Sequence, residues 1–534
     1  MQEFDYVVVG AGSAGCVLAN RLSADPGVSV CLLEAGDEDR SFWIHLPIGY
    51  GKTMWDPAVN WKFQTDPDPH MNGRQVYWPR GKTLGGSSSI NGLIYIRGQR
   101  EDYDQWASLG NTGWSFDEVL PYFIRSECNQ RGADAFHGDS GPLRVSDIGQ
   151  SNALIDAFIE AAQQNGVPRN NDFNGARQEG AGYFQLNTWR GWRWSTAKGY
   201  LKPVRNRPNL TVLTRAHATG LVLEGRRACG VKLLQRGEAR QIRARREVIL
   251  SAGAIQSPQL LQLSGVGPAD LLQAHGVPIV HHLPGVGANL QDHLQIRLIY
   301  ECARPITTND AMNSLVGRIG LGLNWLLFRR GALAVGINQG GCFMRALPEA
   351  QRPDIQFHVA TLSADMAGGK VHPFSGFTLS VCQLRPHSRG DIRIRGTDPL
   401  QPPSIRPNYL SDPLDQRTAV AAVRAARAMA DAPAMRDYVR REVKPGRQDA
   451  DDATLLEFCR DNGATIFHPS GTCSMGQGPM AVLDARLRVH GLQGLRVVDC
   501  SAMPTLVSGN TNAPVVMMAE KAADMIREDA RFPG

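Results

Sequence analysis

One histidine in a run of small residues is the side chain of this sequence that could most directly move a proton. His468 lies in GATIFHPSGTCSMG, residues 463–476, a short way before Cys473. A neutral imidazole has an unperturbed pKa of about 6.5 and can accept a proton near neutral pH. The stretch alone leaves four roles open: a catalytic base, half of a Cys/His nucleophile pair, a metal ligand, or a ring packed beside Pro469.

Two of these roles have no support elsewhere in the chain. Thiol chemistry would need a third group to orient the histidine, and nothing in the sequence supplies one for Cys473. A metal site would need clustered ligands, but His281 and His282 are adjacent, His293 stands apart, and no HxH, HExxH or cysteine cluster occurs. We therefore expect no metal site.

A glycine-rich turn near the N-terminus predicts a dinucleotide site. Residues 4–9 form an apolar strand pattern, residues 13–23 have apolar side chains at helical spacing, and residues 28–34 are a second apolar strand. The turn GAGSAG, residues 10–15, joins the first strand to the helix, as in the βαβ unit of dinucleotide-binding folds. This pattern does not separate FAD from NAD.

Four residues of this unit have separate physical roles. Gly10 makes the tight turn, Gly12 lets the backbone approach a pyrophosphate, and Gly15 allows close packing of helix against strand. Free N–H groups at the start of the helix would hold the phosphates. Glu34, at the end of the second strand, is placed to accept hydrogen bonds from a ribose.

Length and composition predict a multidomain globular protein. The chain has 534 residues, beyond the about 250–300 at which a single core stops growing. Its 42% hydrophobic and 20% charged residues are typical of soluble proteins. The net charge of +6 is mild, and acids flank the densest basic cluster, which argues against a nucleic-acid partner. That cluster comprises Arg240, Arg243, Arg245 and Arg246, beside Glu238 and Glu247.

Cysteine usage and the N-terminus favour the cytoplasm. Ten cysteines without a CxxC pair indicate reduced thiols rather than a disulfide framework. The start MQEFDYVVVG enters a strand pattern directly, so no signal peptide is visible. No apolar run approaches the roughly 18 residues of a transmembrane helix. Peripheral contact with the inner face of a membrane needs no such segment and stays open, as does the oligomeric state.

The rest of the chain predicts a cofactor cover and a second domain. Residues 41–98 are rich in Pro, Gly and Trp with little periodicity, which indicates a segment covering a cofactor rather than a linker. Strand signals between 296 and 455 predict an antiparallel-sheet domain that shapes a substrate pocket. We also expect hairpin strands over 210–234, a strand, turn and helix over 246–267 with the helix opening near Ser257 and Pro258, and helices over 415–430 and 513–527.

Long motifs along the chain resemble one enzyme family. GKTLGGSSSINGLIYIRGQREDYD (81–104) and GAIQSPQLLQLSGVG (253–267) are similar to the two signatures of the glucose–methanol–choline (GMC) flavoprotein oxidoreductases. FHPSGTCSMG and GLRVVDCSAMPTLVSGNTNAPVVMMAEKAADMI resemble the C-terminal catalytic segments of the family, within its bacterial choline-dehydrogenase-like and alcohol-dehydrogenase-like branch. The resemblance implies an α/β fold with a discontinuous Rossmann-type FAD-binding domain (1–155, 205–295 and 456–534). It also implies a substrate domain (156–204 and 296–455) in which helices flank an antiparallel sheet.

The resemblance also implies the cofactor. Family members bind FAD, and some attach the flavin to a histidine just before the asparagine of the first signature. Here Ile90 precedes Asn91, so we expect FAD to be bound non-covalently. The residues expected at the cofactor are Gly10, Gly12, Ser13, Ala14, Gly15, Glu34, Ala35, Arg80, Gly85, Asn91, Gly92, Ile94, Ala218, Gly253, Asp499, Cys500, Asn512 and Ala513.

Two catalytic residues follow from the same resemblance. In the family a histidine and a second residue, histidine or asparagine, face the flavin, and these positions fall on His468 and Asn512. His468 would take the hydroxyl proton of an alcohol, while Asn512 would donate a hydrogen bond to the developing alkoxide. Asn512 would also cap the last helix, whose positive end would then face the flavin. Asp499 falls on the position that contacts the ribityl and phosphate region.

The substrate and the electron acceptor are less defined. In choline-oxidising relatives a glutamate precedes a small-residue run, and Gln339 takes that place here, which favours an uncharged primary alcohol over choline. Phe467, Ile466 and Trp61 would make the pocket apolar if they point inward. The acceptor is a quinone, another carrier or O₂. The alternatives are a choline dehydrogenase and a hydroxynitrile-type lyase on the same fold; His468 argues against a photodecarboxylase.

Overall fold

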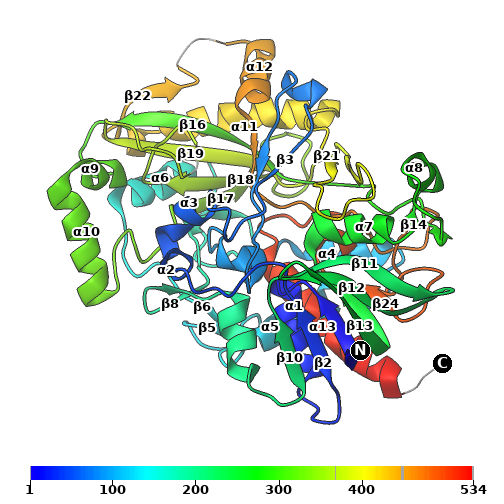
Figure 1. Ribbon diagram of the computed structural model, residues 1–534. Helices are drawn as coiled ribbons and strands as arrows, with labels where there is room; N and C mark the ends of the chain where they lie inside the picture. Colours follow the sequence, from blue (N-terminus) through cyan, green and yellow to red (C-terminus); the bar gives the residue numbers. More distant parts are fainter. Residues whose placement is uncertain (1, 367, 447–449, 532–534) are drawn as a thin grey trace.

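The computed structural model describes residues 2–366, 368–446 and 450–531, and two seven-stranded sheets form its framework (Figure 1). The first sheet consists of β1 (Gln2–Val9), β2 (Val30–Leu33), β10 (Leu210–Leu213), β11 (Ala216–Glu224), β12 (Arg227–Gln235), β13 (Glu238–Leu250) and β24 (Leu495–Val497). Its order is β10-β2-β1-β13-β12-β11, with β24 beside β13. The first four and β24 run parallel, while β12 and β11 extend the sheet as an antiparallel ribbon. Segments from the start, middle and end of the chain therefore share one sheet.

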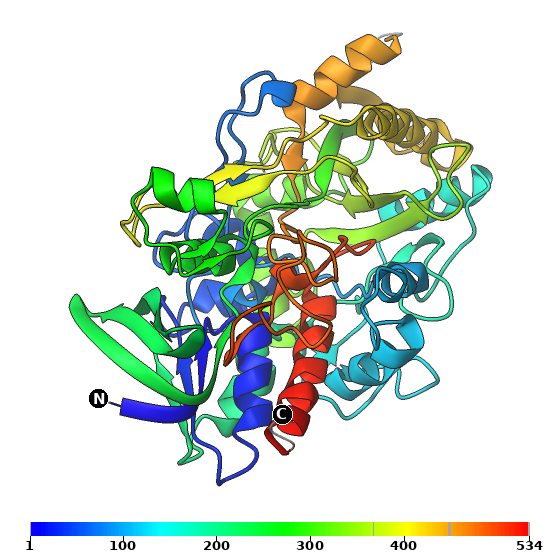
Figure 2. The ribbon, with the colours of Figure 1, turned by 90° about the vertical axis from the view of Figure 1, so that its right-hand side faces the viewer.

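Helices α1 (Ser13–Leu22) and α13 (Asn512–Arg531) pack side by side against this sheet (Figures 1 and 2). Glu520 of α13 is fully buried, which would be costly for an unpaired carboxylate. Arg21 of α1 lies 2.7 Å from Glu520 and Arg125 lies 2.9 Å from it, while the Tyr200 hydroxyl donates to it at 2.8 Å. These ion pairs fix α1 and α13 side by side.

The second sheet is antiparallel. It consists of β7 (Gly180–Tyr183), β16 (Leu294–Cys302), β17 (Asn338–Met344), β18 (Ile355–Ala360), β19 (Gly376–Gln383), β22 (Val439–Lys444) and β23 (Ala464–Thr465). Its order is β22-β16-β19-β18-β17-β7, with β23 beside β16. The α/β fold with an antiparallel second sheet, expected from the resemblance, is confirmed.

Period-two alternation gives this sheet two different faces. Ile296, Phe357 and Leu379 point into a core shared with α6 (Ala153–Gln164) and α11 (Pro413–Asp431). Their neighbours along the strands, among them Arg297, His358 and Ser380, point to the other face, which borders the main cavity. The sheet therefore presents one packed face and one face available to a ligand.

One helix begins earlier than the sequence predicts. Helix α7 (Gly253–Leu263) was expected to open near Ser257, but it starts four residues before that and contains Pro258. Pro258 has no N–H to donate to the carbonyl of Ala254, and such a gap normally breaks a helix. The Thr472 hydroxyl donates to that carbonyl at 2.6 Å instead, so a residue distant in sequence makes the earlier start tolerable.

The other helices are shorter or peripheral. They are α2 (Phe42–His45), α3 (Tyr50–Thr53), α4 (Arg100–Ser108), α5 (Phe116–Ser126), α8 (Ala269–Ala274), α9 (Thr308–Asn313), α10 (Leu315–Phe328) and α12 (Asp452–Asn462). Two-stranded ladders join β3 (Phe63–Gln64) to β4 (Tyr77–Trp78), β5 (Glu127–Asn129) to β6 (Leu143–Val145), β8 (Thr188–Trp189) to β9 (Trp192–Arg193), β14 (Val266–Gly267) to β15 (His281–His282), and β20 (Asp391–Arg393) to β21 (Ser404–Arg406). Within the described residues, none of the helices has both the length and the apolarity to cross a membrane.

Two glycines of the first turn should respond differently to a methyl group. A Cβ on Gly15 would lie 1.9 Å from the Gly10 carbonyl oxygen, whereas the nearest atom to a Cβ on Gly12 would be 3.9 Å away. We expect Gly15→Ala to lower the free energy of unfolding by at least about 2 kcal/mol. Gly12→Ala should leave it nearly unchanged in cofactor-free protein. Thermal unfolding of both variants checks this; equal melting temperatures would contradict it.

Candidate active site

A large cavity lies between the two sheets, and residues of both form its wall. Its volume is about 330 Å³, and it is partly open to solvent. Single small-molecule pockets usually occupy about 300–1,000 Å³. The cavity therefore has the size of a ligand site, and its wall extends from the glycine turn after β1 to the second sheet.

One end of the cavity is built by the glycine turn after β1. Glu34, at the end of β2, accepts hydrogen bonds from the backbone N–H of Ala11 at 3.0 Å and of Gly36 at 2.8 Å. Burial raises the pKa of this carboxyl to about 7. Gly12 faces Gly86 so closely that a Cβ on Gly86 would lie 2.7 Å from the Gly12 Cα. The backbone segments at Gly12 and Gly86, which carry no side chains, therefore form a narrow groove at the N-terminus of α1.

Most of the residues expected at a cofactor lie on this wall. They are Gly10, Gly12, Ser13, Ala14, Glu34, Ala35, Arg80, Asn91, Gly92, Ile94, Ala218, Gly253, Asp499, Cys500 and Asn512. Gly15, Gly85 and Ala513 are not part of it. Gly15 faces the Gly10 carbonyl beneath the turn, and Gly86 lines the cavity in place of Gly85.

Asp499 ties two loops together at the wall. One of its carboxylate oxygens accepts from the N–H of Gly253 at 2.8 Å and from the Ser257 hydroxyl, and the other accepts from Ser501. Burial raises the pKa of Asp499, and these hydrogen bonds oppose that rise. Its carboxylate therefore holds the start of α7 beside the segment that leads to α13.

His468 has a defined partner on each ring nitrogen. Its Nδ1 lies 2.9 Å from Nδ1 of His293, and its Nε2 lies 3.2 Å from Nδ2 of Asn510. Nε2 of His293 lies 2.9 Å from the carbonyl of Leu384, which can only accept. His293 must therefore carry its proton on Nε2, so its Nδ1 accepts a proton-bearing Nδ1 of His468. This leaves a lone pair on Nε2 of His468, facing the cavity.

The surroundings of His468 keep its ring neutral. Burial, then the neighbouring His293, His358 and Arg80, lower the pKa of His468 well below the ordinary value. Burial also lowers the pKa of His293 to about 4 and of His358 to about 3. Three imidazoles beside a guanidinium cannot all hold protons, so the base form of His468 predominates at neutral pH.

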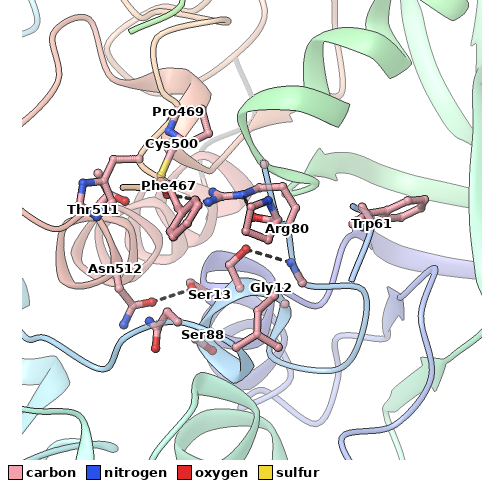
Figure 3. Close-up of a pocket in the computed structure, with 18 of the residues that line it drawn as sticks. Gly12, Ser13, Trp61, Arg80, Ser88, Phe467, Pro469, Cys500, Thr511 and Asn512 are labelled. Carbon is pink, nitrogen blue, oxygen red and sulfur yellow. Dashed lines mark hydrogen bonds between the residues drawn. The ribbon is translucent and has the colours of Figure 1, made fainter. Parts of the chain in front are cut away.

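The backbone at His468 is held in an uncommon conformation. Phe467 has a φ of 74°, in the left-handed region that phenylalanine rarely adopts. Arg80 donates to the Phe467 carbonyl at 2.6 Å (Figure 3). Asp292 accepts from the backbone N–H of His468 at 2.8 Å. The Tyr409 hydroxyl in turn donates to Asp292. Strain of this kind persists where neighbours over-determine it and is common at active sites.

The asparagine beside His468 is not the one expected from the sequence. The Asn512 carbonyl oxygen accepts from the Ser13 hydroxyl at 2.8 Å (Figure 3). The amide nitrogen of Asn512 lies 3.4 Å from the side-chain oxygen of Asn187. Asn512 is the first residue of α13 and lies against α1, whereas Asn510 is in the preceding loop and reaches His468. The pattern Asn-Thr-Asn offers both candidates, and only the packing of α13 separates them.

The far end of the cavity is formed by the open face of the second sheet. Gln295, Arg297, Asn338, His358 and Ser380 line it. Gln339, expected at the substrate, is buried on β17 but is absent from the wall, whereas its neighbour Asn338 lines it, at a register shift between β17 and β18. Ile466, Phe467 and Trp61 do line the cavity, as expected if they pointed inward. The carboxylates on the described part of the wall are Glu34 and Asp499, both committed to other hydrogen bonds.

The fold and this site define a family of flavoenzymes. The family model for GMC oxidoreductase matches residues 4–295, and its C-terminal counterpart matches residues 386–519, so the chain belongs to the GMC oxidoreductases. It is an FAD-dependent oxidoreductase, which confirms the resemblance and the cofactor inferred from the sequence.

Three known proteins show how similar the chain is to its relatives. It is 46% identical to an alcohol dehydrogenase [acceptor] of Pseudomonas putida, over 98% of this chain and 95% of that one. It is 45% identical to an oxygen-dependent choline dehydrogenase of Ectopseudomonas mendocina, over 99% and 95%. The crystal structure of pyridoxine 4-oxidase from Mesorbium loti superposes with a TM-score of 0.89 at 32% identity, covering 98% of this chain and 99% of that one.

The residues of the cavity fit FAD. The α1 N-terminus and the bare Gly12 and Gly86 backbone suit a pyrophosphate, and Glu34 lies at the position of a ribose acceptor. The hydroxyl of Ser251, buried on the wall, has no hydrogen-bond partner within the described residues, as expected of a group that meets a ligand.

Proposed function

We propose that this enzyme oxidises a primary alcohol to the aldehyde, with His468 as the base. The observation that carries the proposal is the fixed tautomer of His468, which directs the Nε2 lone pair into the cavity. The relatives named as an alcohol dehydrogenase and a pyridoxine oxidase support the substrate class. Bound FAD would accept the hydride from the substrate carbon.

The residues of the chain divide the remaining work. The substrate hydroxyl would replace the Asn510 amide at Nε2 of His468 and give its proton to that nitrogen. The displaced amide of Asn510 is then close enough to donate to the developing alkoxide oxygen. Asp292 and Arg80 hold the two ends of the peptide group between Phe467 and His468, and the hydrogen bond to His293 holds the imidazole itself. The N-terminus of α13 would favour negative charge on the flavin.

Non-covalent FAD binding is part of the proposal. Ile90, at the position where some family members attach the flavin, is buried at the cavity wall and has no nucleophilic atom. We also propose the division into an FAD-binding part (1–155, 205–295, 456–534) and a substrate part (156–204, 296–455), supported by the two sheets.

The cavity favours an alcohol without a positive charge. A quaternary ammonium needs a carboxylate or an aromatic cage. The part of the described wall formed by the second sheet offers Gln295 and Arg297 instead, and a guanidinium repels a cation. Choline dehydrogenase activity, supported by the relative of that name, is the second candidate. The electron acceptor is O₂ or a carrier such as a quinone.

Anaerobic mixing with a panel of alcohols tests the proposal. Primary alcohols should bleach the flavin of the holoenzyme, and choline should not. Persistence of the bleached form after air is admitted would mark a dehydrogenase, and rapid recovery an oxidase. A flavin that stays oxidised with every alcohol while an aldehyde is released from a cyanohydrin would contradict the proposal and indicate a lyase.

His468→Ala should slow flavin reduction roughly 10²–10⁴-fold and leave FAD bound. Because the pKa of His468 lies well below its ordinary value, its proton-accepting form persists as pH falls through neutrality. The wild-type reduction rate, measured by stopped flow, should show no inflection near pH 6.5 and decrease only in more acidic solution. Unchanged reduction in the variant would remove His468 from the mechanism.

Substitution of Asn510 and of Asn512 should have different effects on the enzyme. Asn510→Ala should slow reduction about 10–10²-fold with FAD affinity retained, because it removes the donor at His468. Asn512→Ala should chiefly weaken FAD binding, because it frees Ser13 at the start of α1. FAD titration and single-turnover reduction of both variants measure this. The reverse pattern would return the catalytic role to Asn512.

A further inference from the structure

A row of polar side chains on the second sheet ends in an arginine. Arg297 of β16 lies opposite Ser380 of β19, which lies opposite His358 of β18, and all three line the cavity. Neighbouring strands are about 4.8 Å apart, so the row spans about 10 Å. Its His358 end lies close enough to His468 to lower the pKa of that ring. Arg297 therefore marks the end of the row remote from the base.

The guanidinium of Arg297 lines the cavity, where this residue is half-buried, and it has no hydrogen bond or ion pair with any described residue. Two fully buried arginines are paired: Arg97 with Glu127 at 2.7 Å, and Arg496 with Glu247 at 2.6 Å. Asp365, the acid that influences Arg297 from a distance, is paired with His372 at 3.4 Å. An unpaired guanidinium on a cavity wall can form a charge-assisted pair with a ligand anion.

We propose that Arg297 binds a carboxylate on the substrate, so that the enzyme prefers hydroxy acids whose primary alcohol and carboxylate are separated by several methylene groups or an aromatic ring. The proposal rests on the proposed alcohol oxidation and names its substrate class. The alcohol would lie at His468 and the carboxylate at Arg297, with His358 and Ser380 between them. Arg297 would then set specificity without taking part in proton transfer.

The test compares straight-chain ω-hydroxy acids with alcohols of equal length in holoenzyme. Arg297→Gln should raise KM for the hydroxy acid about 10–100-fold, with kcat and the KM of the uncharged alcohol nearly unchanged. Arg297→Lys should restore part of the loss. Arg177→Gln, at an exposed arginine outside the cavity, is the matched control and should behave as wild type.

A second readout separates this proposal from alcohol oxidation itself. Hexanoate cannot be oxidised as an alcohol, and its binding can be titrated through the flavin absorbance. Binding that is lost in Arg297→Gln supports the anion site even if no alcohol bleaches the flavin, in which case the proposed function alone fails. Hexanoate binding that is equal in wild type and variant, or no preference for hydroxy acids, would overturn the proposal.

An independent observation concerns the outer face of α10, at the edge of the molecule (Figure 1). Its large apolar side chains are exposed, with Val316 at 81% and Leu327 at 65%, while Trp325 alone is buried against Leu46 and Trp192. A surface helix normally buries its apolar face and exposes its polar face to water, so the orientation of α10 is unusual. The exposed set is Leu315, Val316, Ile319, Leu323, Leu326, Leu327 and Phe328.

The charged residues around α10 indicate which kind of partner would cover its exposed apolar face. Residues 311–348 contain no Asp or Glu, but Arg318 and Arg330 are exposed on and just after α10. A second copy would bring the same arginines and no acids to pair with them. We infer that α10 lies in the headgroup region of an anionic lipid surface, where apolar side chains and arginines are both satisfied. The chain continues from α10 to Ile337 on the cavity wall, so the cavity would open beside the membrane.

Vesicle flotation of the holoenzyme tests this inference. Vesicles containing phosphatidylglycerol should bind the protein, and pure phosphatidylcholine vesicles should bind it less. The double variant Val316→Glu with Leu327→Glu should bind at least about tenfold more weakly. Leu400→Glu, at a leucine 59% exposed away from α10, should bind as wild type. Arg318→Glu with Arg330→Glu should remove the preference for anionic lipid.

Two outcomes would overturn the membrane inference. One is binding to neither vesicle, or binding that the double variant at Val316 and Leu327 does not change. The other is a dimer in sedimentation analysis that this variant dissociates while vesicles remain unbound, which would assign the face to a second copy. Flavin absorbance and melting temperature of each variant show that it is folded.

Discussion

The hydrogen bond between His293 and His468 is the interaction on which the active site depends. It joins the start of the second sheet to the C-terminal loop, and the Leu384 carbonyl behind it decides which nitrogen carries each proton. The Leu384 carbonyl thus fixes the tautomer of His293, and His293 in turn fixes the tautomer of His468. The cavity-facing nitrogen of His468 is a proton acceptor because of an atom that no substrate touches.

Elements whose patterns are local could be predicted from the sequence. The glycine turn, Glu34 and the first two strands follow from residues adjacent in the chain, and the structure places them as expected. The start of α7 could not be predicted, because the group that replaces the missing Pro258 N–H comes from Thr472. Local propensity predicts where a helix starts only if its carbonyl groups find their partners nearby in the sequence, and the carbonyl of Ala254 finds its partner in Thr472.

The candidate site was harder to predict than the fold. His468 could be singled out, but choosing between Asn510 and Asn512 requires the residue at which α13 begins and the direction of its first turn. Gln339 takes the place of a glutamate in the sequence, but it lies off the cavity wall, at a register shift that the sequence does not reveal. Arg297 gave no signal in the sequence, since an arginine in a strand pattern is ordinary until its lack of a partner is seen.

The contact between Ser13 and Asn512 has a consequence for assembly. Ser13 begins α1 and Asn512 begins α13, while Arg21 meets Glu520 further along, so the two helices run in the same direction. Parallel helices place their positive ends together, and like partial charges repel. A bound diphosphate would neutralise the end at α1 and so relieve this repulsion. Cofactor loading would therefore complete the electrostatics of the fold as well as supply its chemistry, and the empty chain would be the less stable form.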